Sequence, residues 1–178
     1  LALRATVNTG FRAPTPGQIN TTDVTTASDL DGTLIPLGTF GINTPAARAL
    51  GAQPLETEES FNVSVGLVFE PLDNFTLTVD YYNIDIDDRI VLNTTLIEPG
   101  SPERQALIDA GVSGGNLIGS ASFFLNGFDS TVQGVDVVAN AQFDLGDAGY
   151  LITDARHSYN DQDVDRFVEG TIDPARIF

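Results

Sequence analysis

The chain of 178 residues contains no Cys, Met, Trp or Lys, and its only strong cations are 8 Arg residues. Without Cys it can form no disulfide, no thiolate metal site and no Cys nucleophile. Without Lys it has neither the lysine of a Walker A phosphate loop nor a Schiff-base lysine. Because it also lacks Met, we interpret the chain as an internal piece of a longer protein.

The charge of the chain is strongly one-sided. Asp and Glu together number 25, which gives a formal net charge of −17 at pH 7. Nucleic-acid binding depends on clustered cations, so we exclude nucleic acid as a partner. The hydrophobic fraction of 42% is too high for a disordered acidic tail. No signal peptide and no run of 18 apolar residues is present, but strands that alternate in polarity can cross a membrane without one.

Apolar residues alternate with polar ones over several segments, which is the period of a half-buried strand. The clearest run is 61–69, and a short turn at 71–74 separates it from a second run that begins at Phe75. The phase of the second run shifts at Tyr81-Tyr82, which predicts a β-bulge or strong bend there. In all, strands are predicted over about 1–10, 61–70, 75–92, 131–145 and 150–160.

The connections between these strands alternate between short and long. Tight turns follow residues 70 and 145, whereas 11–60, 93–130 and 161–178 are long. Capping residues and a proline at the first helical position predict short helices at 44–51 and 101–111. Long loops on one rim and short turns on the other are typical of outer-membrane barrels. The sequence therefore predicts an all-β fold, an antiparallel up-and-down meander forming part of a large transmembrane β-barrel, with long outer loops that carry short helices.

Alternation alone also fits a soluble, secreted β-sandwich binding module with acidic, calcium-binding loops, and this alternative stays open. Aromatic residues near the strand ends favour the membrane, since they resemble an interfacial girdle. In a barrel the polar face lines the lumen, and the predicted lumen-facing residues are Arg4, Asp80, Asp136 and Asn140. A charge cluster is predicted at the rim, where a strand emerges into a loop, and comprises Asp85, Asp87, Asp88 and Arg89.

Four segments in order, at 9–15, 50–60, 79–90 and 123–136, resemble the C-terminal half of the barrel of TonB-dependent outer-membrane receptors. They include Thr-Gly-Phe-Arg-Ala-Pro-Thr from residue 9 and Val-Asp-Tyr-Tyr-Asn-Ile-Asp-Ile-Asp-Asp-Arg-Ile from residue 79. The positions that match the family pattern are Gly10, Phe11, Arg12, Pro14, Glu58, Ser60, Tyr81, Tyr82, Asp87, Asp88, Arg89, Ile90, Asn126, Gln133, Gly134 and Asp136.

The resemblance implies active uptake of a scarce ligand, of the iron–siderophore, cobalamin or saccharide class, across the outer membrane of a Gram-negative cell. The implied partners are outer-membrane lipid and a small-molecule ligand at the outer loops. The TonB complex would be reached only through an N-terminal part that is missing here. No catalytic activity, cofactor or metal is implied. The chain departs from the family in lacking the plug domain, and Asp173-Pro174 precedes the C-terminal Phe178, where the family has a final strand.

Three further motifs have simpler explanations. Asp29-Leu30-Asp31-Gly32-Thr33-Leu34 matches the DxDGT signature of haloacid-dehalogenase-type phosphatases, but the apolar strand and the lysine of that chemistry are missing. The acidic segment 161–165 resembles a calcium loop, but Arg166 and Ile172 stand where an EF-hand needs Gly and Glu. His157 and Ser158 are neighbours on a predicted strand and point in opposite directions, which argues against a hydrolytic triad with Asp154. We expect no enzymatic site here.

Overall fold

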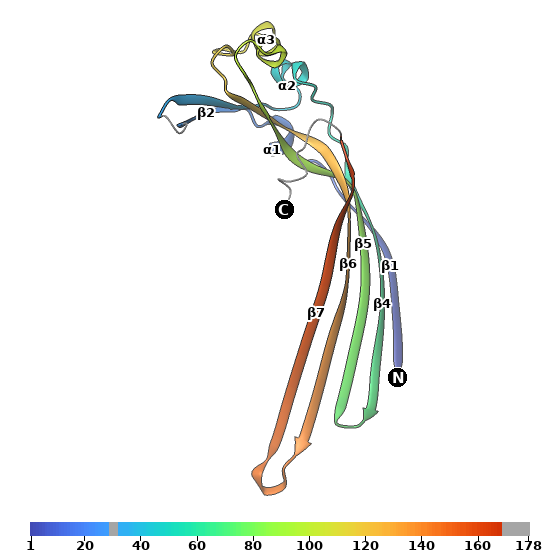
Figure 1. Cartoon of the computed structure of the whole chain (residues 1–178). Helices are drawn as coiled ribbons and strands as arrows, with labels where there is room; N and C mark the ends of the chain where they lie inside the picture. The colour runs from blue at the N-terminus through green and yellow to red at the C-terminus, as the bar shows by residue number, and fades with distance from the viewer. Residues whose placement is uncertain (29–31, 169–178) are drawn as a thin grey trace. The chain divides into compact units, whose positions relative to one another are not determined.

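The computed structural model describes residues 1–28 and 32–168 (Figure 1). Most of these residues lie in strands, and the described helices are short. The chain divides into two compact units. The strand unit comprises Leu1–Phe11, Glu59–Asp87 and Asp129–Asp165, and the loop unit comprises Arg12–Glu58, Asp88–Phe128 and Arg166–Phe178.

Five long strands dominate the described chain, and they form one mainly antiparallel sheet with two shorter strands. The long strands are β1 (Ala2–Arg12), β4 (Glu58–Leu72), β5 (Phe75–Leu96), β6 (Ser120–Asp144) and β7 (Tyr150–Phe167). Neighbouring strands follow the order β1-β4-β5-β6, and β7 also pairs with β6. A tight turn joins β4 to β5, and the 3₁₀ turn η1 (Gly146–Ala148) lies between β6 and β7. Within the described residues the strand order does not return to β1, as expected of part of a β-barrel.

The register of β4 and β5 shows which side chains share a face, because cross-strand partners point to the same side of a sheet. Gly66 pairs with Asp80, and Val68 pairs with Thr78, on one face. The other face is apolar, and its partners are Val65 with Tyr81, Leu67 with Val79, and Phe69 with Leu77. The alternation in the sequence therefore becomes two chemically distinct faces.

The bulge predicted at Tyr81-Tyr82 is wrong. Pairing with β4 is continuous through both residues, and the irregularity in this hairpin lies between Phe69 and Leu72. Tyr82 therefore shares a face with Asp80 and points opposite to Tyr81. The phase shift in the sequence marks an exchange of chemical character between the two faces of β5, and no residue is inserted in its pairing with β4.

The loop unit contains the remaining elements. They are α1 (Pro16–Asn20), β2 (Asp23–Ser28), β3 (Leu34–Thr39), α2 (Pro45–Ala49) and α3 (Pro102–Asp109). β2 pairs antiparallel with β3, and β3 runs parallel to the first residues of β6. The stretch 11–60, predicted as a loop with one helix, thus also contributes two strands and α1.

Each helix begins at a hydroxyl residue that caps it, followed by a proline in the first turn. Thr15, Thr44 and Ser101 accept hydrogen bonds from backbone N–H groups of the first turns of α1, α2 and α3. The helices predicted at 44–51 and 101–111 are confirmed as α2 and α3. A small apolar core holds them, and its buried members include Phe40, Ala46, Ala47, Leu107 and Ile118.

All five predicted strands correspond to a long strand, and each strand extends beyond the predicted bounds. β5 continues to Leu96, β6 already begins at Ser120, and β7 continues to Phe167. In these extensions the apolar alternation fades while pairing with a neighbouring strand continues. Among the described residues, no helix combines the length and the apolar character needed to span a membrane.

Candidate functional site

The polar face of the strand unit carries an ion pair between Arg4 on β1 and Asp80 on β5. Arg4 donates from Nε at 2.9 Å and from Nη2 at 2.5 Å to the two carboxylate oxygens of Asp80. Gly66 lies between them on β4, and a Cβ there would overlap both side chains. The missing side chain of Gly66 therefore makes room for a bidentate Arg–carboxylate pair. Two of the four predicted lumen-facing residues are thus brought together.

Further polar contacts lie in the same unit. Asn62 donates to Asn8 at 2.8 Å, and the hydroxyl of Ser158 donates to Asp136 at 2.5 Å. Asn140 lies four residues beyond Asp136 on β6, which places it on the same face. These contacts link β1 with β4 and β6 with β7 through side chains as well as backbone.

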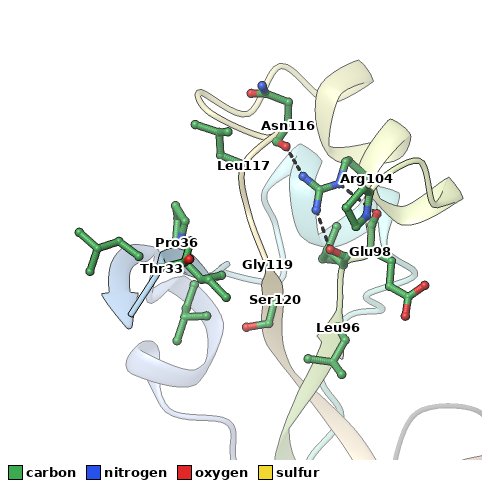
Figure 2. A pocket seen from close by; sticks show the side chains of 14 residues that line it. Thr33, Pro36, Leu96, Glu98, Arg104, Asn116, Leu117, Gly119 and Ser120 are labelled. Atoms are coloured by element: carbon green, nitrogen blue, oxygen red, sulfur yellow. Dashed lines mark hydrogen bonds between the residues drawn. The ribbon is translucent and has the colours of Figure 1, made fainter. Parts of the chain in front are cut away.

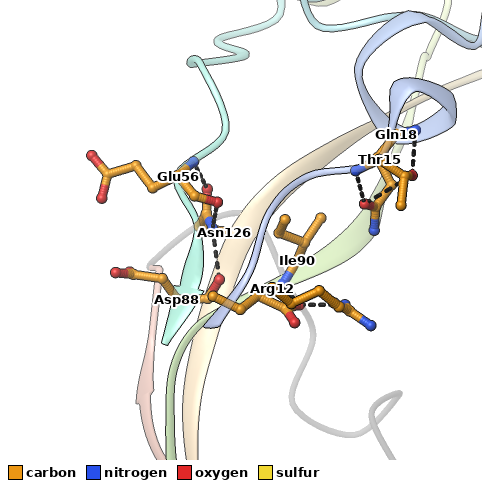
Figure 3. A network of polar contacts seen from close by, with 8 residues as sticks. Arg12, Thr15, Gln18, Glu56, Asp88, Ile90 and Asn126 are labelled. Carbon is orange, nitrogen blue, oxygen red and sulfur yellow. Dashed lines mark hydrogen bonds and ion pairs between the residues drawn. The ribbon is translucent and has the colours of Figure 1, made fainter. Parts of the chain in front are cut away.

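In the loop unit, Glu58 is the most buried carboxylate that the structure describes, at 8% exposure. Figure 3 shows its partners Arg12 and Ile90. Its Oε1 accepts from Arg12 Nη2 at 2.5 Å and from the backbone N–H of Ile90 at 2.7 Å. A single carboxylate thereby connects the end of β1 to β5. Its two partners, like Glu58 itself, are family-motif positions.

Asn126, another family-motif position, binds backbone groups on both sides (Figure 3). Its Oδ1 accepts from the N–H of Glu56 at 2.8 Å. Its Nδ2 donates to the carbonyl oxygens of Glu56 and Asp88, at 3.1 Å and 2.6 Å. The side-chain amide thus satisfies both backbone groups of Glu56, in the segment that leads into β4, as a neighbouring strand would. A small pocket of about 270 Å³ adjoins these residues.

Members of the predicted rim cluster contact residues outside the cluster. Asp88 adopts a left-handed backbone conformation (φ 55°), which Asp tolerates better than most residues, and its carboxylate accepts from Arg166 at 3.0 Å. The guanidinium of Arg89 lies over the ring of Phe128, 5.1 Å from its centre. Asp85, in the strand unit, accepts hydrogen bonds from Asn83 and Thr131. Arg166 could not be predicted as a partner of Asp88, because the two residues are far apart along the chain.

Other family-motif positions concern close packing. A Cβ on Gly10 would come within 2.9 Å of the hydroxyl of Ser60, and one on Gly134 would overlap the hydroxyl of Tyr82. Both glycines therefore stand where a neighbouring side chain crosses the backbone. Of the other positions, Phe11, Tyr81 and Asp87 are exposed, and Pro14 and Gln133 are partly buried.

A pocket of about 660 Å³ lies in the loop unit (Figure 2). The backbone of Gly119 forms its floor by donating to Pro36 O at 2.8 Å and accepting from Ile97 N at 2.9 Å. Arg104 of α3 closes one wall by donating to the carbonyl oxygens of Glu98 at 3.0 Å, Ile97 at 2.7 Å and Asn116. Sequence reasoning missed this pocket, because its walls come from three separate segments.

The weaker motifs lie partly outside the described residues. Asp29 and Asp31 of the DxDGT motif lie outside the described residues, as does Asp173-Pro174. Asp161, Asp163 and Asp165 are exposed on β7, and Asp165 accepts from Thr131 at 2.7 Å. Within residues 1–28 and 32–168, no group of three or more His, Asp or Glu is placed to hold a metal ion.

The family model described as TonB dependent receptor-like, beta-barrel matches residues 1–174. No curated protein and no solved structure matches the chain. The match covers the strands, the loop elements and both groups of polar contacts described above.

Proposed function

Because the chain belongs to the TonB-dependent receptor β-barrel family, whose members are ligand transporters of the bacterial outer membrane and not enzymes, we propose that it forms part of a barrel wall and presents ligand-gathering outer loops. The transported ligand is a scarce small molecule of the iron–siderophore, cobalamin or saccharide class. The membrane is the outer membrane of a Gram-negative cell. Uptake of the ligand is coupled to the TonB complex.

One observation carries the proposal, namely the contrast between the two faces of the β4–β5 hairpin. The side chains of Val65, Leu67, Phe69 and Tyr81 on the apolar face are between 39% and 43% exposed. A β-sandwich buries such a face against a second sheet. In the strand unit these side chains remain uncovered, so acyl chains are the partner that suits them. This weighs against the soluble β-sandwich alternative.

The opposite face supports a water-filled passage. There Arg4 pairs with Asp80, and Asp136 accepts from Ser158. Charged groups on the lipid face of a barrel cost several kcal/mol near the membrane midplane, about 2–4 kcal/mol for Arg. Both ion-pair partners therefore belong on the lumen side, together with Asn140.

The exchange of character at Tyr81-Tyr82 supports a membrane boundary at this level of β5. Beyond Tyr81, β5 places Asn83 and Asp85 on the face that carried Val79, opposite Val63 and Phe61 of β4. Polar residues on that face suit water or headgroups, and an aromatic residue such as Tyr81 suits the interface between the two. In this proposal the long loops, with their pocket and short helices, are the segments that meet a ligand.

A spin-label accessibility scan tests the proposal directly, because the absence of native Cys makes any introduced Cys unique. Single substitutions Ser64→Cys to Phe69→Cys would be labelled with a nitroxide in the protein reconstituted into liposomes. We expect positions 65, 67 and 69 to be relaxed by oxygen, which concentrates in acyl chains. Positions 64 and 68 should respond to a water-soluble nickel chelate.

Val68 is the informative control, because it is apolar and yet lies on the polar face opposite Thr78. A response to the nickel chelate at 68 would show that the face, rather than residue hydrophobicity, decides the environment. Equal access of the chelate to positions 65, 67 and 69 would refute a lipid-facing wall and restore the soluble alternative.

A further inference from the structure

The pocket beside Gly119, in the loop unit, is shaped by backbone hydrogen bonds and close packing. Backbone hydrogen bonds fix its floor on two sides, to Pro36 and to Ile97. A Cβ on Gly119 would overlap Cγ2 of Ile35, so β3 can approach this closely only because residue 119 is Gly. Its volume of about 660 Å³ lies within the usual range of small-molecule sites, roughly 300–1,000 Å³.

The walls of this pocket are apolar and open to solvent. Leu34 and Leu96 are each 71% exposed, and Leu117 is 63% exposed. Three large aliphatic side chains that remain uncovered around one cavity gain free energy when a ligand covers them, about 25 cal/mol per Å² of apolar surface buried. An apolar ligand body therefore suits the cavity.

Arg104 adds a charge to this apolar site. Its three recorded partners are neutral backbone carbonyl oxygens, and among the described residues no carboxylate is within ion-pair distance of it. Three of its five N–H groups are used, so two remain for another acceptor. The full positive charge consequently faces the pocket without an anionic partner from the described chain.

We propose that this pocket binds the apolar body of a small amphipathic anion whose acidic group meets Arg104. Carboxylates and sulfonates are the acceptors that a guanidinium binds most strongly. Glu98 also lines the pocket, and its negative charge weakens the binding of an anion by electrostatic repulsion. This inference rests on the proposed function, since it assigns a chemical class to the ligand that the outer loops gather.

Two aromatic probes of nearly the same shape test the role of charge. The anionic probe is 8-anilinonaphthalene-1-sulfonate, and the neutral one is N-phenyl-1-naphthylamine. In liposome-reconstituted protein carrying Leu117→Cys as its only thiol, a water-soluble thiol reagent would label the pocket. We expect the anionic probe to protect this thiol at a concentration about tenfold lower than the neutral probe, as one charge-assisted contact allows.

The matched control is Val24→Cys on β2, which is 51% exposed and does not line the pocket. Neither probe should protect it. Equal protection of the two thiols would show non-specific partitioning and overturn the site. Equal half-protecting concentrations for the two probes would overturn the role of Arg104.

Two variants in the Leu117→Cys background test the charges separately. Arg104→Gln should raise the half-protecting concentration of the anionic probe about tenfold and leave that of the neutral probe unchanged. Because Arg104→Gln also removes carbonyl contacts, Glu98→Gln serves as an independent test. It should lower the half-protecting concentration of the anionic probe severalfold, and an unchanged value would overturn the charge assignment.

A lipid could supply the same chemistry, and the vesicles distinguish the two sources. If liposomes with anionic phosphatidylglycerol protect Leu117→Cys without any probe, whereas phosphatidylcholine liposomes do not, the occupant is lipid and the small-molecule inference is wrong. The spin-label scan of β4 separates this from the proposed function. If neither probe protects Leu117→Cys while the spin-label accessibility still alternates over positions 64–69, the pocket inference is wrong and the proposed function stands.

Discussion

Glu58 is the residue whose replacement gives the sharpest test of the loop unit. It is 8% exposed, and one of its oxygens accepts from both Arg12 and the buried N–H of Ile90. Glu58→Ala removes both acceptor contacts, whereas Glu58→Gln keeps a carbonyl oxygen of the same reach. The two variants therefore separate the loss of an acceptor from the loss of a charge.

The expected cost of Glu58→Ala comes mainly from Ile90. A buried N–H left without an acceptor costs about 1–3 kcal/mol. The side chain of Arg12 is 61% exposed, so solvent screens its contact and the loss of that ion pair adds at most about 1 kcal/mol. Glu58→Gln should cost only about 1 kcal/mol, the difference between a charge-assisted and a neutral hydrogen bond.

Hydrogen exchange at the amide of Ile90 measures the loss of its hydrogen bond locally. Denaturant unfolding of the same variants measures the change in the total free energy of unfolding. We expect the Ile90 amide to exchange about tenfold faster in Glu58→Ala than in Glu58→Gln, since the midpoints of the two expected costs differ by about 1.4 kcal/mol, a factor of ten. Equal exchange in the two variants would refute the reasoning, because it would mean that the Glu58 acceptor does not hold this amide.

Three further predictions follow from packing. Leu107→Ala should lower the free energy of unfolding by about 2–5 kcal/mol because Leu107 is fully buried, whereas Ile108→Ala, at a 44% exposed position on the same helix, should cost far less in urea unfolding. Gly66→Ala should displace Asp80 from its ion pair, so its effect on thermal unfolding should largely vanish in the Asp80→Ala background, and full additivity would contradict this. Gly119→Ala should cost about 1–3 kcal/mol in urea unfolding by forcing Ile35 away, and an unchanged midpoint would show that β3 packs less closely.

The sequence was most informative where local chemistry decides the structure. The alternation over 61–69 predicted β4, and the capping residues Thr44 and Ser101 predicted α2 and α3, because each pattern needs only near neighbours. The capping-box pair Thr15 and Gln18 is equally local and could have predicted α1.

What the sequence could not provide depends on partners far along the chain. β2 and β3 show little alternation and exist as strands because β3 pairs with β6. The pocket walls, with Arg104 and Leu117, come from segments that only the fold brings together. The false bulge at Tyr81-Tyr82 has a different origin, since a change of surroundings along a regular strand imitates an inserted residue.

The parallel pairing of Leu37–Thr39 with Ser120–Ser122 has a consequence for how the molecule assembles. The hairpin of β4 and β5 closes over a two-residue turn. The pairing of β3 with β6 joins segments far apart in the chain, so it requires a long loop to close and forms more slowly. Each doubling of the loop length adds only about 0.6 kcal/mol to the entropic cost of closing the loop. Insertions or deletions between these two paired segments should therefore cost little stability and leave the β4–β5 hairpin unchanged.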